Sequence, residues 1–171
     1  MQAPTLETER LRLRPWRSDD LDVFADFMAD AEDTRFIAGP LSREDTWRRI
    51  ALFFGHWELR GFGNWVVEEK ASGAFAGYSG LWYPEGWQHK ELMWGILPAY
   101  RGRGYATEAA TRARTYAYGE LGWATIVSYI APTNLPSRAV AERLGATRDG
   151  TIELRGAVAD VWRHPAKVNC T

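Results

Sequence analysis

The sequence contains almost no cysteine and no long apolar run. Its one cysteine, Cys170, is the second-last of 171 residues, so neither an internal disulfide nor a thiolate metal cluster can form. A reducing, cytoplasmic environment fits this composition. No stretch approaches the ~18 apolar residues that a membrane-spanning helix needs, and segment 1–10 is polar rather than signal-like. We therefore expect a soluble protein that is neither exported nor bound to a membrane.

Histidine and net charge are scarce as well. None of the three histidines, His56, His89 and His164, stands near a second ligand at a metal-binding spacing, so no metal site is expected. The 21 Lys and Arg balance 22 Asp and Glu, which leaves a formal charge of -1 and no positive field for DNA or RNA. Arginines still gather around 101–114 and 138–148. Such groups either bind a small polyanion or form a solvated surface.

Apolar and aromatic residues are plentiful. At 46% hydrophobic and 13% aromatic the chain can build one core, and no repeat, low-complexity tract or linker divides it. We expect a single domain over residues 1–171, as a monomer or a homodimer. Nine tryptophans are more than core packing usually requires, so some are candidates for the wall of a ligand groove. Ordinary packing is the alternative.

Hydrophobic periodicity predicts a mixed α/β (α+β) fold with seven strands. The predicted strands cover residues 6–14, 65–69, 74–82, 90–97, 125–130, 147–154 and 157–163. Helices are predicted over residues 18–28, 42–59, 104–121 and 135–144. The strands between residues 65 and 97 follow one another through short turns, which favours an antiparallel meander. The helix at 104–121 carries alanines at helical spacing, and these small residues allow close packing on a sheet.

Residues 100–106, Tyr-Arg-Gly-Arg-Gly-Tyr-Ala, join a buried strand to this helix. A helix N-terminus has unpaired N–H groups and the positive end of the helix dipole, so it binds phosphate when the chain can approach closely. Gly102 and Gly104 permit that approach, because a side chain at either position would hold the phosphate away from the amides. The segment therefore predicts a pyrophosphate cradle.

Two common nucleotide motifs do not fit this segment. A Rossmann turn requires a small third residue, where Thr107 stands, and an acid about 20 residues further on. Residues 125–130 supply no such acid. A Walker A loop requires Gly-Lys-Ser/Thr, which the chain lacks. Chemistry driven by ATP or GTP is thus disfavoured.

The cradle matches the acyl-CoA-binding pattern R/Q-x-x-G-x-G/A, with Arg101, Gly104 and Ala106 at the fixed positions. Together with the strand before it and Asn134-x-x-Ser137 further on, it resembles the GNAT N-acetyltransferase superfamily, in particular the RimJ/RimL-type branch. The resemblance implies a mostly antiparallel seven-stranded sheet flanked by helices, in which the fourth and fifth strands begin parallel and then splay apart. It also implies acetyl-CoA as cosubstrate.

The same resemblance assigns acetyl-CoA binding to the fourth strand, the cradle and the helix after Asn134. The residues implied are Met93, Trp94, Gly95, Ile96, Leu97, Arg101, Gly102, Arg103, Gly104, Tyr105, Ala106, Thr107, Asn134, Ser137 and Arg138. In such proteins the pantetheine arm lies between the splayed strands and bonds to the fourth strand as an extra strand would. Gly95 fits this role, because glycine inside a strand often marks the close approach of another backbone. A packing glycine is the alternative.

Acetyl transfer to an amine requires a base, a donor to the oxyanion and an acid for the leaving thiolate, but no protein nucleophile. Glu91 is the one acid of its strand and the candidate base, acting directly or through a water. An ion-paired residue at the strand end is the alternative. The N–H of Met93 or Trp94 is the candidate oxyanion donor.

By resemblance to the RimL-like branch, Ser137 is the candidate acid. Many GNAT enzymes place a tyrosine seven residues after the asparagine, but that position is Ala141 here. Asn134 would bind the amides of pantetheine. In the alternative interpretation, Asn134 and Ser137 simply cap the helix.

The acceptor is the part of the function that the sequence defines least. Phe36, Trp82 and Tyr83 are candidates for the wall of an amine pocket, with core packing as the alternative. The expected function is direct transfer of the acetyl group from acetyl-CoA to a primary amine, either a protein N-terminus or a small molecule. A non-catalytic acyl-CoA-binding or sensing module is the competing function.

Overall fold

The computed structural model describes residues 3–37 and 39–166, so Cys170 lies outside the described residues. One sheet of eight strands has the order β1-β2-β3-β4-β5-β6-β8-β7. The strands are β1 (Leu6–Glu7), β2 (Leu11–Arg14), β3 (Asn64–Glu69), β4 (Phe75–Trp82), β5 (Glu91–Ile96), β6 (Val127–Ile130), β7 (Thr147–Leu154) and β8 (Ala157–Arg163). The helices are α1 (Leu21–Ala29), α2 (Ala31–Thr34), α3 (Arg43–Arg60), α4 (Tyr105–Gly119) and α5 (Leu135–Arg143), with 3-10 turns at Ser18–Asp20 and Pro98–Tyr100. The predicted mixed, mostly antiparallel sheet is confirmed.

The predicted number of strands is wrong by one, because residues 6–14 form a short hairpin rather than one strand. Thr8 closes its turn: the backbone N–H donates to the carbonyl oxygen of Leu11 (2.9 Å), and Oγ1 accepts from the N–H of Leu11 (3.0 Å). Leu6 pairs with Leu13 across the hairpin, and both are buried with Leu11. The alternation of apolar and charged residues therefore continues across the turn and hides it.

Helix α2 is not among the predicted helices, because its four residues are too few to show a helical period. Asp30 caps this helix, accepting hydrogen bonds from the N–H groups of Glu32 and Asp33, each at 2.9 Å. The cap places Asp33 at the edge of the cavity described below.

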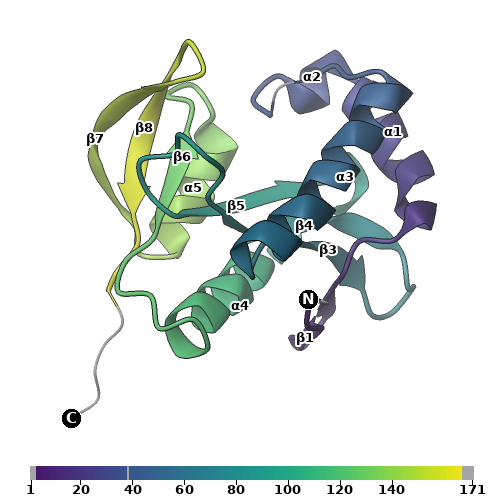
Figure 1. Ribbon diagram of the computed structural model, residues 1–171, viewed down its shortest axis with the longest axis horizontal. Helices are drawn as coiled ribbons and strands as arrows, with labels where there is room; N and C mark the ends of the chain where they lie inside the picture. The colour runs from purple at the N-terminus through teal and green to yellow at the C-terminus, as the bar shows by residue number, and fades with distance from the viewer. Residues whose placement is uncertain (1–2, 38, 167–171) are drawn as a thin grey trace.

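Helices cover both faces of the sheet (Figure 1). On one face lie α4 and α5. Of the predicted alanine stripe of α4, Ala110, Ala113 and Ala117 are fully buried there, whereas Ala106 is half-buried and lines the cavity described below. On the other face α1 and α3 bring Phe24 and Phe53 against Tyr78 of β4. Within residues 3–37 and 39–166, no helix is both long and apolar enough to cross a membrane.

The sheet is divided between β5 and β6. These two strands are parallel neighbours, but they share a single paired position, Glu91 opposite Val127, next to a hydrogen bond from the N–H of Val127 to Lys90 (3.0 Å). The rest of β6 pairs only with β8, so the two halves of the sheet move apart (Figure 1). The predicted splaying of the fourth and fifth strands is confirmed, with β5 and β6 as these strands.

A buried chain of hydrogen bonds holds the point where the strands part. The hydroxyl of Ser128 on β6 donates to the carbonyl oxygen of Leu92 on β5 (2.6 Å). Its Oγ must then accept from Nε2–H of His164 (2.9 Å), which leaves Nδ1 to accept from Arg114 (3.3 Å). The same guanidinium nitrogen of Arg114 donates to the carbonyl oxygen of Leu144 (2.6 Å). Burial first and the charge of Arg114 second lower the pKa of His164 to about 4.

We predict that His164 makes the fold sensitive to acid. Because its folded pKa of about 4 lies below the ordinary value of 6.5, the unfolded chain binds a proton more tightly, and stability is lost as pH falls from 6.5 toward 4. Between pH 7.5 and 5 the parent should lose about 2 kcal/mol more free energy of unfolding than His164→Asn. Urea unfolding of both proteins at the two pH values measures this difference, and equal losses would contradict it.

Candidate functional site

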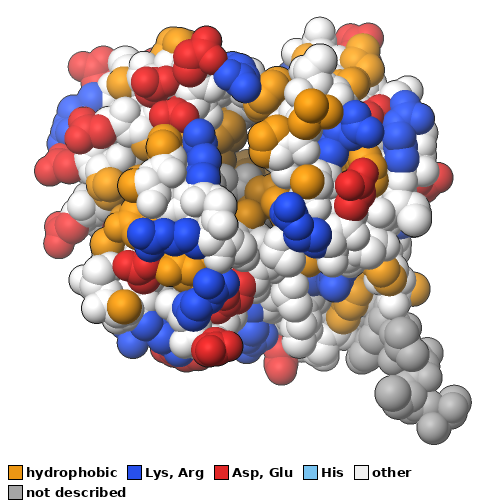
Figure 2. Space-filling view, turned by 180° about the vertical axis from the view of Figure 1, so that it is seen from behind, with side chains coloured by type: hydrophobic (Ala, Val, Ile, Leu, Met, Phe, Trp, Pro, Cys, Tyr) orange, Lys and Arg blue, Asp and Glu red, His pale blue; other side chains and the backbone are white. Residues whose placement is uncertain are grey.

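A cavity of about 1060 Å³ lies where β5 and β6 part. It extends from the N-terminus of α4, past the middle of β5, to the segment that follows α2. Seen from behind, the molecule is hollowed between its two parts, with hydrophobic side chains on the walls and Lys and Arg side chains near the rim (Figure 2). A cavity of this size suits a large organic ligand.

The structure brings most of the predicted site residues together around this cavity. Those that line it are Phe36, Glu91, Met93, Trp94, Gly95, Ile96, Arg101, Gly102, Arg103, Gly104, Tyr105, Ala106, Thr107, Asn134 and Ser137. The predicted residues outside its lining are Leu97, Arg138, Trp82 and Tyr83. Segments from four separate parts of the chain therefore meet at one site.

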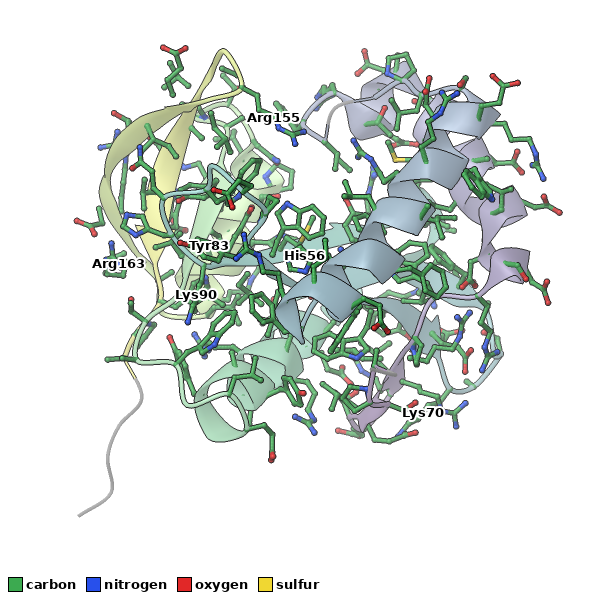
Figure 3. The ribbon with its side chains drawn as sticks, viewed as in Figure 1. His56, Lys70, Tyr83, Lys90, Arg155 and Arg163 are labelled. Carbon is green, nitrogen blue, oxygen red and sulfur yellow. The ribbon has the colours of Figure 1, made fainter. Side chains whose placement is uncertain are left out.

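Trp82 and Tyr83 serve the attachment of β4 to α3 instead. Trp82 is buried and stacks on His56, with ring centroids 4.3 Å apart. The backbone N–H of Tyr83 donates to Nε2 of His56 (3.0 Å), so Nδ1 carries the proton toward the carbonyl oxygen of Phe62 (2.7 Å). Figure 3 shows His56 on α3 facing the segment that carries Tyr83. Tyr83 lines a separate, smaller cavity of about 330 Å³ beside Lys90.

The sequence analysis missed several lining residues, among them Arg10, Tyr78 and Tyr129. Tyr78 is visible only once the register is known, because β4 places it directly opposite Gly95 of β5. A Cβ on Gly95 would lie 2.6 Å from the Tyr78 ring. Gly95 therefore makes room for the Tyr78 ring, and this packing explains why a glycine stands at position 95.

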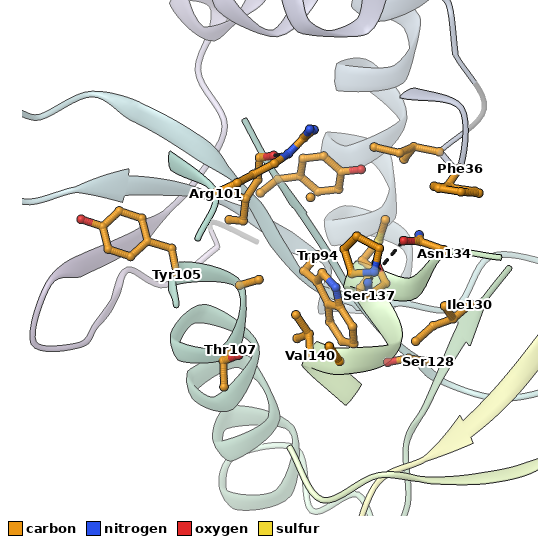
Figure 4. Close-up of a pocket in the computed structure, with 18 of the residues that line it drawn as sticks. Phe36, Trp94, Arg101, Tyr105, Thr107, Ser128, Ile130, Asn134, Ser137 and Val140 are labelled. Carbon is orange, nitrogen blue, oxygen red and sulfur yellow. Dashed lines mark hydrogen bonds between the residues drawn. The ribbon is translucent and has the colours of Figure 1, made fainter. Parts of the chain in front are cut away.

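The cradle has the backbone conformation that its glycines allow. Gly102 and Gly104 have φ values of +75° and +81°, a left-handed region that other residues rarely adopt. Gly104 caps α4, and the first bond into the helix runs from Glu108 N–H to Gly104 O (3.0 Å), so the preceding N–H groups of the first turn remain available. Figure 4 shows Thr107 on this turn, and its Oγ1 is buried without a hydrogen-bond partner.

The arginines around the cradle are already paired with acids. Arg101 donates to Asp33 (2.7 Å) and, through Nε, to the carbonyl oxygen of Ile96 (3.0 Å). Arg103 forms an ion pair with Glu69 at 2.8 Å. Arg10 likewise binds Glu108 and also donates to the carbonyl oxygen of Arg103 (2.9 Å). These contacts fix the shape of the cradle, so the unpaired backbone N–H groups are its main donors.

The alternation of β5 decides which backbone groups face the gap. Leu97 N–H donates to the carbonyl oxygen of Ala76 on β4 (2.9 Å), and Tyr78 lies opposite Gly95 in the same register. Since hydrogen-bonded positions alternate along an antiparallel pair, the N–H and C=O groups of Trp94 point away from β4, into the gap left by β6. The bonds that Ile96 O and Leu92 O accept from Arg101 and Ser128 follow the same direction.

Glu91 stands where the two strands part, and it is partly buried. Its Oε2 accepts a hydrogen bond from the indole Nε1 of Trp87 (2.8 Å). Burial raises the pKa of Glu91 to about 7, against the opposing effects of Trp87, the backbone N–H of Tyr129 and the more distant charge of Arg155. No Lys or Arg among the described residues forms an ion pair with it, so the alternative of an ion-paired strand end does not fit.

The N-terminus of α5 closes the cavity on the side of β6. Asn134 caps this helix by accepting from the N–H of Ser137 (3.3 Å), as Figure 4 shows. The capping interpretation therefore holds for Asn134. The hydroxyl of Ser137 has no hydrogen-bond partner among the described residues, and Ala141 is fully buried one turn further on.

A family model described as an acetyltransferase (GNAT) domain matches residues 10–147 of the sequence. The chain belongs to the GNAT acetyltransferase family. Such a GNAT domain transfers acetyl groups from acetyl-CoA, and the match includes the cradle and both splayed strands.

Individual GNAT relatives agree with this assignment. An acetyltransferase from Agrobacterium tumefaciens has 34% identity and a TM-score of 0.88, over 96% of each chain. The uncharacterized protein YkkB of Bacillus subtilis is 30% identical over 89% of this chain and 91% of its own. The FsC-acetyl coenzyme A-N(2)-transacetylase of Aspergillus fumigatus is 29% identical over 84% of this chain and 65% of its own.

The residues present fit acetyl-CoA, the donor of GNAT acetyltransferases. The left-handed glycines and the free N–H groups of α4 suit its diphosphate, and the unpartnered Oγ1 of Thr107 adds a donor there. The open edge of β5 at Trp94 offers backbone groups to an extended amide chain such as pantetheine. Arg138 and Leu97 remain predicted contacts that the cavity lining does not include.

We predict that Gly104→Ala lowers the affinity for acetyl-CoA at least tenfold. The new methyl group would lie in the cradle, where the nearest atom to a Cβ is a nitrogen of Arg10 at 3.5 Å. Gly122→Ala is the matched control, since Gly122 has a similar φ of +64° with open space around it, beyond the far end of α4. Both variants should lose about 1 kcal/mol of stability. Isothermal titration that finds equal acetyl-CoA affinities for both would contradict the cradle assignment.

Proposed function

We propose that this GNAT domain is an N-acetyltransferase that moves the acetyl group of acetyl-CoA directly to a primary amine. The observation that carries the proposal is Glu91, a carboxyl in the lining of the cavity that has no ion-pair partner among the described residues and whose pKa is raised to about 7. A general base works best when its pKa lies near the operating pH. A module that only binds acyl-CoA has no need for such a group.

In this proposal Glu91 removes a proton from the amine, directly or through a water. An amine is protonated at neutral pH and must lose a proton before or during attack on the thioester. Trp87 holds one carboxylate oxygen of Glu91 in place, and the residue lines the cavity. The side chains of Glu91 and Met93 point to the same side of β5, so the acceptor approaches from the α1 and α3 face.

The backbone N–H of Trp94 is the proposed donor to the oxyanion. Of the two candidates from the sequence, Met93 has its N–H directed toward β4, whereas that of Trp94 faces the gap. A fixed backbone donor stabilises the charge that develops on the carbonyl oxygen without having to reorient. This choice narrows the alternatives that the sequence left open.

Ser137 is the proposed acid for the leaving thiolate. Its hydroxyl lines the cavity and is free of other hydrogen bonds within the described part of the chain. The position where many GNAT enzymes carry a tyrosine is Ala141, which is buried and has no proton to give. Ser137 therefore has no evident competitor on α5.

The proposed acceptor is a primary amine, and the RimJ/RimL-type branch remains part of this proposal. The solved structure of a putative ribosomal-protein-serine acetyltransferase from Vibrio cholerae shares the fold, with a TM-score of 0.79 at 20% identity. A protein N-terminus and a small-molecule amine are both compatible with a cavity of this volume, which extends to Phe36 and Ile37 after α2. We place the reaction in the cytoplasm, as the composition suggests.

We predict that Glu91→Gln lowers kcat about 100-fold or more while acetyl-CoA affinity stays within about twofold of the parent. The parent's kcat/KM should rise with pH and level off above about 7, as the carboxyl loses its proton, and the variant's profile should be flat. The release of free CoA, assayed over an amine library and a range of pH, measures kcat and kcat/KM. A parent profile without this rise, or full turnover in Glu91→Gln, would remove Glu91 as base.

The same substitution has a second expected effect, on stability. Because the folded pKa of Glu91 exceeds its ordinary value of 4.5, the folded state binds the proton more tightly, and stability is lost as pH rises from 4.5 through about 7. Glu91→Gln removes this cost and should be more stable than the parent at pH 8, by on the order of 2 kcal/mol. Urea unfolding at pH 8 tests the raised pKa independently of catalysis.

We predict that Ser137→Ala lowers kcat about tenfold to 100-fold without a matching loss of stability. The helix cap is retained, because Asn134 bonds to the backbone N–H of residue 137 rather than to its side chain. Ser137→Thr, which keeps a hydroxyl, should recover part of the rate. Stopped-flow detection of free thiol measures the effect, and unchanged kcat in Ser137→Ala would assign the residue a structural role only.

A further inference from the structure

Beside the acceptor side of the cavity, just outside its lining, lies an arginine that no acid among the described residues neutralises. Arg49 extends from α3, is partly buried, and donates through Nη1 to the carbonyl oxygen of Ile37 (3.1 Å). Ile37 itself lines the cavity, next to Phe36. Within the described residues, Arg49 has no ion-pair partner. None of its remaining N–H groups is both buried and without a hydrogen-bond partner. Water or a ligand can therefore reach them.

A second arginine reaches the same region from the opposite half of the sheet. Arg155 lies in the turn between β7 and β8, and Figure 3 shows it at the tip of this hairpin, extending over the gap toward the segment after α2. Its guanidinium carbon lies 5.0 Å from the ring centroid of Trp87. The indole of Trp87 is the group that donates to Glu91 (2.8 Å). The ring of Trp87 therefore lies between Arg155 and the proposed base, Glu91, and contacts both.

The backbone at Arg155 shows that this turn is not optimised for its own stability. Arg155 has φ of +53° and Gly156 has φ of +79°, so both central residues of the hairpin turn are left-handed. Such turns favour Asn-Gly or Asp-Gly, because few other side chains tolerate the first position. Arg155 is the one non-glycine residue with positive φ in the described part of the chain. Strain of this kind is typical of functional positions.

The two arginines act on each other and on the site. Burial is the main cause that lowers the pKa of Arg49, and the positive charge of Arg155 adds to it, which places the two guanidinium groups within electrostatic reach. The charge of Arg155 also lowers the pKa of Glu91. By contrast, the arginines of the cradle, Arg101 and Arg103, each have a carboxylate partner. Arg49 and Arg155 thus differ from these two cradle arginines in having no carboxylate partner among the described residues.

We propose that Arg49 and Arg155 bind an anionic group, a carboxylate or a phosphate, on a small amine acceptor whose nitrogen lies at Glu91. This inference rests on the proposed function. Guanidinium groups bind both anions with paired, charge-assisted hydrogen bonds. Burying an anion beside Arg49 would also neutralise a charge that the fold leaves without a carboxylate. Arg155 would reach the anion from its place beside Trp87, while Phe36 and Met93 provide apolar walls for the chain between the amine and the anion.

The experiment compares acceptors that differ only in charge. The probes are ω-amino acids of increasing length with their carboxamides, aminoalkyl phosphates with the matching amino alcohols, and short peptides with free N-termini. Each is assayed for CoA release with the parent, Arg155→Asn, Arg49→Gln and the control Arg48→Gln. Asn suits the left-handed turn and removes only the charge. Arg48 is exposed, neighbours Arg49 on α3 and pairs with Asp45 at the surface, so its loss is a matched change in charge.

The parent should show kcat/KM at least tenfold higher for one class of anionic acceptors than for their neutral partners, as expected for one charge-assisted pair. Arg155→Asn should raise KM about tenfold for the anionic acceptors only, and Arg48→Gln should change neither class. The carboxylate and phosphate arms identify the anion. Equal rates for acids and amides, equal losses for both classes, or peptides surpassing every anionic small amine would each overturn the proposal.

Failure of the base and failure of the anion site give different results. If Glu91→Gln retains turnover while Arg155→Asn still loses only anionic acceptors, the proposed base is wrong and the anion site stands. If no amine is acetylated, tryptophan fluorescence of the acetyl-CoA complex reports binding of the same probes next to Trp87. Binding of the anionic probes that is weakened in Arg155→Asn supports the site, and no binding, or binding that the variant does not change, overturns it. Arg155 is exposed, so this variant remains informative even if Arg49→Gln fails to fold.

Discussion

The parting of β5 and β6 after a single shared position is the constraint on which the site depends. If the strands continued to pair beyond Glu91 and Val127, β6 would cover the N–H of Trp94, and the cavity would be filled by sheet. Ser128 prevents this, because its side chain rather than its backbone bonds to Leu92. His164 and the α4 helix hold that serine in place. A polar network therefore maintains an opening that hydrogen bonding between the strands would otherwise close.

The opening separates two chemical tasks along one strand. Alternate side chains of β5 point to opposite faces, so Glu91 and Met93 face the layer of α1 and α3, whereas Leu92 and Ile96 belong to the core under α4. The backbone of Trp94 lies in the plane between these layers. A thioester held along that edge is thus open to a base from one face while its phosphates remain at the helix N-terminus of α4. The sheet itself keeps donor and acceptor on separate paths.

What the sequence could predict follows from how local each feature is. The cradle was predictable because Gly102, Gly104 and the helix that follows determine their own conformation within a few residues. The hairpin hidden in residues 6–14 was not, since its leucines keep the same alternation on both sides of the turn. The sequence leaves Trp82 as a candidate for either the acceptor wall or the core, because its stacking partner, His56, lies on a helix distant in sequence. Likewise, the pairing that sets Tyr78 against Gly95 exists only in the folded register.

The pairing of charges shows most clearly the difference between features set by neighbouring residues and contacts between residues distant in sequence. The sequence shows where arginines cluster, but only the fold shows which of them are already neutralised. In the cluster at 101–114, Arg101 and Arg103 are each paired with an acid. The donor is then held mainly by backbone N–H groups and a helix dipole, which side-chain substitutions leave intact. The acceptor that we propose would meet side chains on α3 and on a hairpin turn, where a substitution changes the local charge directly. Such a division allows one scaffold to keep its donor constant while the acceptor changes.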